Sequence, residues 1–195
     1  MKSKKRDAVI NSFPVNVFEK GFIWRVLKLL TFNSKAAVAF NSNVYLYTDE
    51  IKDKSLFFLL FHETIHYEQQ KKDKLFLIKY FIPQIIGVFA LFGFFAFLTK
   101  FFLFSLIFLL FFLPWSSPYR SAFEYEAYGS TFLLKEKLNY KHQNVAFIVN
   151  LFVSFSYYKM DRKFTKEAFY KKLDDLNLKY KDQVEKYEII FKELF

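Results

Sequence analysis

Two of the three histidines in this 195-residue chain flank a glutamate in the segment His62-Glu63-Thr64-Ile65-His66. On a helix, residues four positions apart lie on the same face, so both imidazoles can bind one metal ion. Glu63 projects beside that face, where it can take a proton from a metal-bound water instead of binding the metal itself. The segment therefore predicts a Zn²⁺ site with His62 and His66 as ligands and Glu63 as the general base.

A third protein ligand is needed, because catalytic zinc usually has three protein ligands and one open position. The chain has no cysteine, so this ligand must be a histidine or a carboxylate. His142 lies in a polar, loop-like stretch and is expected at the surface. Glu124 and Glu126 are better candidates, because they lie on a predicted helix directly after a long apolar segment. The residues alone leave the choice between these two glutamates open.

The combination of His62-Glu63-Xaa-Xaa-His66 with Glu124-Tyr125-Glu126-Ala127 resembles the zinc metallopeptidases whose third ligand is a glutamate, the gluzincin type. In their membrane-embedded members, of the prenyl-protein-protease and heat-shock-protease kind, that ligand is the first Glu of Glu-Xaa-Xaa-Ala-Asp. The resemblance thus implies Glu124 as the third metal ligand. The family's Asp corresponds to Tyr128 here, so a carboxylate that orients a histidine is either missing or supplied by Glu126.

Gln69 extends the motif to His-Glu-Xaa-Xaa-His-Xaa-Xaa-Gln, which also resembles a group of small bacterial and phage proteins. In those proteins a short strand precedes the motif helix. The resemblance covers roughly residues 36–130 and is carried by the motifs alone. It implies a zincin-like fold and a zinc-dependent peptidase, in which metal-activated water attacks the carbonyl of a peptide or protein substrate.

The elements that must position these residues are mostly helical, so the expected fold class is mainly α (α+β) in one domain, residues 1–195. The motif helix is predicted over residues 55–72, after a β-hairpin formed by 36–40 and 44–48. The second of these strands can offer an edge to an extended substrate. An irregular or extended lead-in is expected over 1–20, and further helices are expected over 21–33, 121–138, 143–158 and, as one helix or a pair, 165–195.

Residues 80–115 form the most apolar part of the chain and contain one charge, Lys100. A single helix of this length would measure about 52 Å, well beyond a hydrocarbon core of about 30 Å. Two arms, 81–98 and 101–115, with Lys100 at the tip, fit a transmembrane hairpin better. The alternative is a pair of buried helices in a soluble core. A two-pass hairpin also leaves the motif helix and Glu124 on the same side of the bilayer, as a shared metal ion requires.

The net charge of +10 is compatible with binding to nucleic acid or to anionic lipid. The lysines are spread along helices and flank the apolar segment, so we expect membrane lipid as a partner and no nucleic acid. Their concentration at the base of the hairpin predicts an integral membrane protein whose site faces the cytoplasm. The main alternative function is that of a non-catalytic membrane protein, structural or interacting, with a degenerate metal site.

Overall fold

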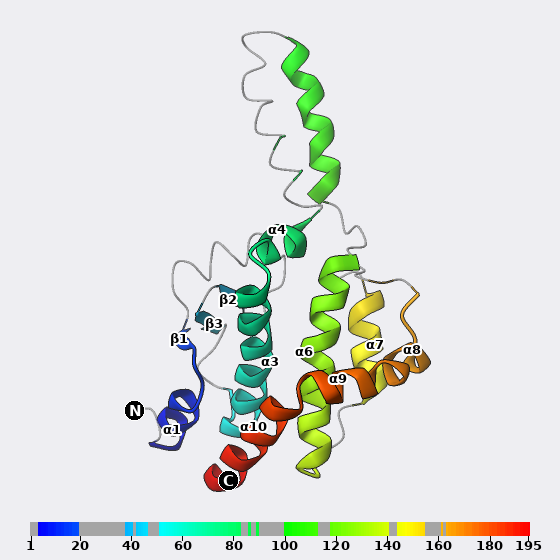
Figure 1. Cartoon of the computed structure of the whole chain (residues 1–195). Coiled ribbons are helices and arrows are strands. Elements are labelled where there is room, and N and C mark those ends of the chain that lie inside the picture. The colour runs from blue at the N-terminus through cyan, green and yellow to red at the C-terminus, as the bar shows by residue number, and fades with distance from the viewer. Residues whose placement is uncertain are drawn as a thin grey trace.

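The computed structural model describes residues 4–19, 38–40, 42–46, 51–82, 86, 89, 100–112, 118–140, 144–154, 161 and 163–195, and this part of the chain is mainly helical (Figure 1). The strands are β1 (Asn16–Glu19), β2 (Val38–Phe40) and β3 (Asn43–Leu46). The helices are α1 (Lys4–Asn11), α3 (Asp53–Lys72), α4 (Phe76–Phe81), the 3-10 helix η2 (Lys100–Phe112), α6 (Pro118–Lys137), α7 (Val145–Val153), α8 (Lys166–Lys171), α9 (Leu173–Lys179) and α10 (Lys181–Leu194).

The two helices expected to carry the site, α3 and α6, pack against each other in antiparallel directions (Figure 1). The second half of α3 therefore lies beside the first half of α6. The predictions of helices over 55–72 and 121–138 are confirmed, each to within a few residues. Asp53 in the first turn of α3 and Lys71 and Lys72 in the last turn oppose the helix dipole and favour these ends.

Helix α3 is buried around most of its circumference, which is unusual for a helix with several polar residues. Apolar side chains such as Leu56, Phe57 and Leu60 are fully buried. Glu63 and His66 are almost as deeply buried. Buried polar groups require partners, since an unsatisfied one destabilises the fold by about 1–3 kcal/mol. The polar half of the motif helix thus faces the interior, where partners must come from other elements.

The small sheet has the order β1-β3-β2, with β1 parallel and β2 antiparallel to β3. The predicted hairpin is confirmed over 38–40 and 43–46, where Val38 is paired with Tyr45. The expectation that its second strand offers a free edge is wrong, because β3 is the central strand. Strand β1 was not predicted, because it pairs with β3 from more than twenty residues away and no local turn pattern connects the two strands.

The N-terminal segment differs from the irregular lead-in expected over 1–20, because it contains α1 and β1. Helix α1 has few apolar residues, and Val9 is the one apolar side chain in it that is fully buried. Arg6 is also buried and donates a hydrogen bond to the carbonyl oxygen of Ile51. The helix is stabilised by contacts with distant elements, which a local apolar pattern does not reveal.

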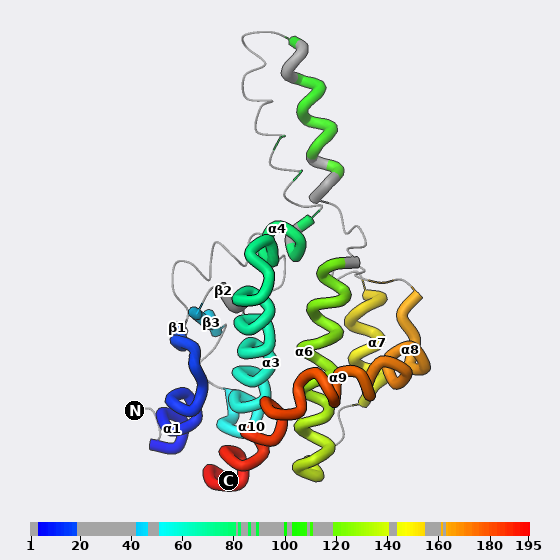
Figure 2. The backbone as a smooth tube through the Cα atoms, in the orientation of Figure 1, coloured from blue at the N-terminus to red at the C-terminus, as the bar shows by residue number. Residues whose placement is uncertain are grey.

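The C-terminal region forms three helices, where one or two were expected over 165–195. Helices α9 and α10 cross the α3–α6 pair (Figure 2). Tyr187 of α10 stacks on Phe13 at 4.8 Å between ring centroids and contacts Phe57 of α3 edge to face. Helix α9 approaches α6 closely at Gly129, where a Cβ would lie 2.3 Å from a methyl carbon of Leu176, so any larger residue would require the Leu176 side chain to move. The helix expected over 143–158 is confirmed as α7 over 145–153 and ends before Ser154, whose backbone is extended, while residues 155–158 lie outside the described part of the chain.

The apolar segment 80–115 is described only in part. Its second arm forms η2, which projects away from the other helices beyond α4 (Figure 2). Large apolar side chains on η2 are exposed, among them Phe104 at 74% and Ile107 at 63%. Within the described residues, no helix combines the length and the apolar character needed to cross a bilayer. Most of the first arm, the end of the second arm and the helix expected over 21–33 lie outside the described residues.

Candidate metal centre

The structure brings together His62 and His66 of α3 and Glu124 of α6. Glu124 Oε2 lies 3.5 Å from His62 Nε2 and 3.6 Å from His66 Nε2. Ligand atoms of the three side chains all lie within 4.8 Å of one another. The side chains are 12%, 7% and 4% exposed in the order His62, His66 and Glu124, so the group is nearly closed to solvent.

These separations fit donors around a shared ion better than they fit hydrogen bonds. A hydrogen bond between nitrogen and oxygen is usually about 2.7–3.2 Å long. Two ligands bound at about 2.0–2.1 Å to a tetrahedral zinc ion stand about 3.3 Å apart. Glu124 Oε2 is buried and has no hydrogen-bond partner within the described part of the chain. The buried carboxylate oxygen and the two imidazole nitrogens that it faces are therefore a suitable set of donors for a divalent cation.

The orientation of the His66 ring is fixed by Gln69, one turn further along α3. His66 Nδ1 lies 2.8 Å from Gln69 Oε1. The amide nitrogen of Gln69 donates to the carbonyl oxygen of Phe123 at 3.1 Å and to Glu126 Oε2 at 2.9 Å. Since these two acceptors determine which end of the amide is nitrogen, Nδ1 of His66 must carry the proton that it donates to Oε1. Nε2 is then the ring nitrogen that faces Glu124.

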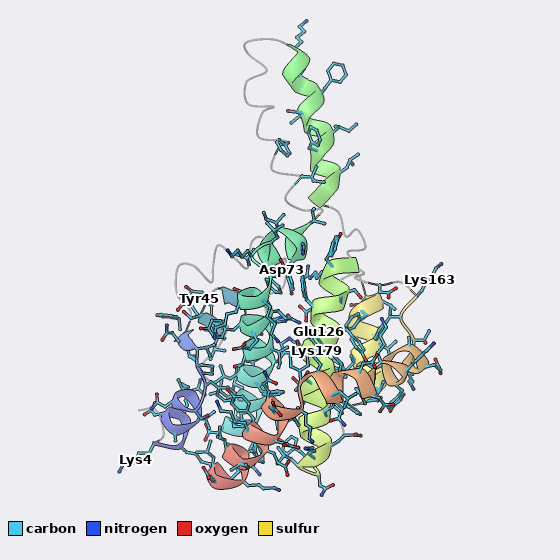
Figure 3. All side chains as sticks on the ribbon, viewed as in Figure 1. Lys4, Tyr45, Asp73, Glu126, Lys163 and Lys179 are labelled. Carbon is cyan, nitrogen blue, oxygen red and sulfur yellow. The ribbon has the colours of Figure 1, made fainter. Side chains whose placement is uncertain are left out.

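Glu126 is not part of the metal-binding group but acts on it indirectly, through Gln69. Its carboxylate also pairs with Lys179 and accepts a hydrogen bond from the Tyr180 hydroxyl at 2.6 Å. Figure 3 shows Glu126 and Lys179 facing each other where α6 meets α9. Burial raises the pKa of Glu126, but Lys179, Tyr180 and Gln69 together lower it below its usual value. The carboxylate therefore stays ionised and anchors the amide that orients His66.

Aromatic rings surround the two histidines. The Tyr128 ring contacts His62 edge to face at 4.5 Å, and the Tyr80 ring lies 5.9 Å from that of His66. The Tyr80 hydroxyl donates a hydrogen bond to Glu124 Oε1. The parts played by Tyr80, Lys179 and Tyr180 were not predicted from the sequence. Each lies more than forty residues from its glutamate partner, and no local pattern connects them.

The charges of the site are strongly coupled. Burial lowers the pKa of His66, but the nearby charges of Glu124 and Glu63 and the hydrogen bond to Gln69 outweigh burial and raise that pKa to about 9. Burial raises the pKa of Glu124, while His66 and His62 bring it well below its usual value. Without a metal, His66 and Glu124 thus form a buried imidazolium–carboxylate pair. Metal binding must then displace a proton from His66, because a ligand imidazole is neutral.

We expect His66 in the metal-free protein to remain protonated up to about pH 9, since its pKa is raised by Glu124. A raised folded-state pKa means that this proton stabilises the fold fully below about pH 6.5, the unfolded value. That contribution is lost as the pH rises through about 9. NMR titration of the imidazole resonances measures the pKa directly, with Glu124→Gln as the matched variant in which it should fall. Titration of His66 near 6.5 in the wild type would contradict the expected coupling.

Glu63, the expected general base, follows His62 on α3 and is buried. Its negative charge contributes to the raised pKa of His66. His142, which the sequence placed at the surface, lies outside the described residues.

The chain has no match among protein-family models, curated proteins or solved structures. What the site can do is therefore inferred from its own residues.

Proposed function

We propose that the protein is a zinc-dependent peptidase anchored in a membrane, with His62, His66 and Glu124 as metal ligands and Glu63 as the general base. The observation that carries this proposal is the convergence of three donor atoms, two from α3 and one from α6, around a buried point. Their types match a zinc site that has three protein ligands and leaves one position open for water or substrate.

The proposed chemistry follows from the residues around that point. A bound zinc ion would lower the pKa of a water molecule towards 7 and polarise a carbonyl group. Glu63 would accept the proton of the attacking water and then deliver it to the leaving amine. Gln69 keeps the Nδ1 proton of His66 in place, so that Nε2 presents its lone pair to the ion. Hydrolysis of a peptide bond in this way needs no further cofactor.

The proposed membrane anchor is the apolar segment 80–115, arranged as a two-pass hairpin. Exposed apolar side chains on one projecting helix are unfavourable in water and typical of surfaces that meet a membrane or another protein. On η2, Leu103, Phe104, Ile107 and Leu110 are all at least half exposed. Lys71, Lys72 and Lys74, at the end of α3 close to where the segment begins, are exposed and can approach anionic head groups. Their positive charge supports a site on the cytoplasmic side.

The second candidate is a non-catalytic membrane protein in which the same residues are structural. It is favoured by the mutual neutralisation of His66 and Glu124, which provides each with a charged partner even without a metal. It predicts a chain that folds, stays in the membrane and neither requires zinc nor hydrolyses peptides.

One preparation tests both candidates. The protein should remain with the membrane after an alkaline wash, and the detergent-solubilised chain should contain one zinc ion and cleave labelled casein. A chelator should remove zinc and activity together, and added zinc should restore both. A chain that binds zinc without any cleavage would support the structural alternative, and a chain that the wash releases would refute the membrane anchor.

A further inference from the structure

Tyr80 links the apolar segment to the metal-binding group. It lies in α4, the helix from which that segment continues, and its hydroxyl donates to Glu124 Oε1. The other oxygen of the same carboxylate, Oε2, faces both imidazole nitrogens. One glutamate therefore has its two oxygens divided between a phenol and the proposed metal position.

The division matters because a carboxylate can bind a metal through one oxygen or through both. An oxygen that accepts a charge-assisted hydrogen bond has less electron density to offer a cation, and one of the two lone pairs of Oε1 is already used by the Tyr80 hydroxyl. A Glu124 without that hydrogen bond could rotate and bind through both oxygens. This second bond would occupy the open position that substrate or water needs.

The Tyr80 ring is itself positioned from several sides. The Arg120 guanidinium of α6 lies over the ring at 4.8 Å from its centroid. The Phe76 ring stacks on it at 5.5 Å, and the His66 ring approaches it edge to face at 5.9 Å. These contacts come from α3, α4 and α6, so they fix the hydroxyl relative to all three ligands.

We propose that Tyr80 is a positioning residue that restricts Glu124 to binding the metal through Oε2 alone. This inference rests on the proposed metal site and adds to it the residue that keeps one coordination position open. It also assigns a role to the base of the apolar segment, which contributes a side chain to the site besides its proposed contact with the membrane.

The test is a comparison of Tyr80→Phe with wild-type protein, using Co²⁺ and Zn²⁺ alone as probes. Loss of a ligand's hydrogen-bond partner typically weakens metal binding by about 10–100-fold, because the ligand is no longer held in its binding orientation. We expect this loss to outweigh the gain from a second carboxylate bond and to reduce the Zn²⁺ affinity within that range. Four-coordinate Co²⁺ absorbs visible light more strongly than five-coordinate Co²⁺. The wild type should give the intense spectrum, and Tyr80→Phe the weaker one, because the released Oε1 can become an additional ligand.

Tyr125→Phe is the matched control, since the Tyr125 hydroxyl also donates a buried hydrogen bond from its helix, at 2.8 Å to the carbonyl oxygen of Phe169. It should lower thermal stability without changing the metal affinity or the Co²⁺ spectrum. An unchanged affinity and spectrum in Tyr80→Phe would overturn the role of Tyr80 and leave the metal site standing. Absence of Co²⁺ and Zn²⁺ binding in the wild type would overturn both.

Wild-type protein provides a second measurement that does not depend on a folded variant. Infrared difference spectra on zinc binding should show widely separated carboxylate stretches, as expected for a carboxylate bound through one oxygen. Narrowly separated stretches, which indicate binding through both oxygens, would also overturn the inference.

Discussion

Replacing Glu63 by glutamine should leave the zinc content of the protein unchanged and reduce peptide hydrolysis by about 10²–10⁴-fold, the contribution typical of a general base. The amide has nearly the shape of the carboxylate, so the buried surroundings of Glu63 should be preserved. It has no basic oxygen that could accept a proton from water. The effect should therefore fall on kcat rather than on folding or metal binding.

The matched control for this variant is Glu68→Gln, on the same helix. Glu68 is partly exposed and pairs with Lys71 at 3.3 Å, so its neutralisation should leave both zinc content and hydrolysis close to wild type. Zinc is measured by atomic absorption on the purified chain and hydrolysis by release of label from casein. Full activity in Glu63→Gln would refute the proposed mechanism, whereas zinc loss would indicate that Glu63 has a structural or ligand role.

A second large effect on zinc affinity is expected at Glu124 but not at Glu126, the two glutamates between which the residues alone leave the third ligand undecided. Glu124→Gln should weaken zinc binding by more than the 10–100-fold that accompanies loss of an orienting partner, because it removes a charged ligand. Glu126→Gln should weaken it by about tenfold at most, since Glu126 reaches His66 only through Gln69. The difference follows from the 3.5 and 3.6 Å separations that Glu124, and not Glu126, makes with the imidazoles.

Competition with a chromophoric chelator measures both affinities, and circular dichroism checks that each variant is folded. The pair is well matched, because both substitutions neutralise a glutamate on α6 and both remove hydrogen-bonded contacts. A larger loss of affinity in Glu126→Gln than in Glu124→Gln would exclude the proposed ligand set.

Sequence predicted well those elements whose pattern is local. A helix is needed for His62 and His66 to bind one metal ion, because residues four apart then lie on the same face. The helix predicted over 55–72 for this reason is confirmed as α3. The hairpin predicted over 36–40 and 44–48 likewise matches the pairing of β2 with β3. Convergence of Glu124 on the histidines was expected only from resemblance to known metallopeptidases, because no periodicity specifies which face of α6 meets α3.

Other features depend on tertiary contacts and leave little trace in the sequence. Strand β1 joins the sheet in parallel, and α1 is stabilised by packing and by a hydrogen bond from Arg6 to Ile51, not by an apolar stripe of its own. From the sequence, Tyr80 is only the first residue of the apolar segment 80–115. Its hydrogen bond to Glu124 depends on the fold of α4 against α6, across 44 residues of chain.

The anchoring of Glu126 by Lys179 and Tyr180 has a practical consequence for work on the protein. A fragment that ends after α6 would include every proposed ligand and the base, and it would satisfy any search for the motif. It would nevertheless deprive Glu126 of Lys179 and Tyr180, which help to keep its carboxylate ionised and in place beside Gln69. The smallest unit worth expressing for biochemistry therefore extends past α9 to include these two residues, although the motifs occupy less than half of its length.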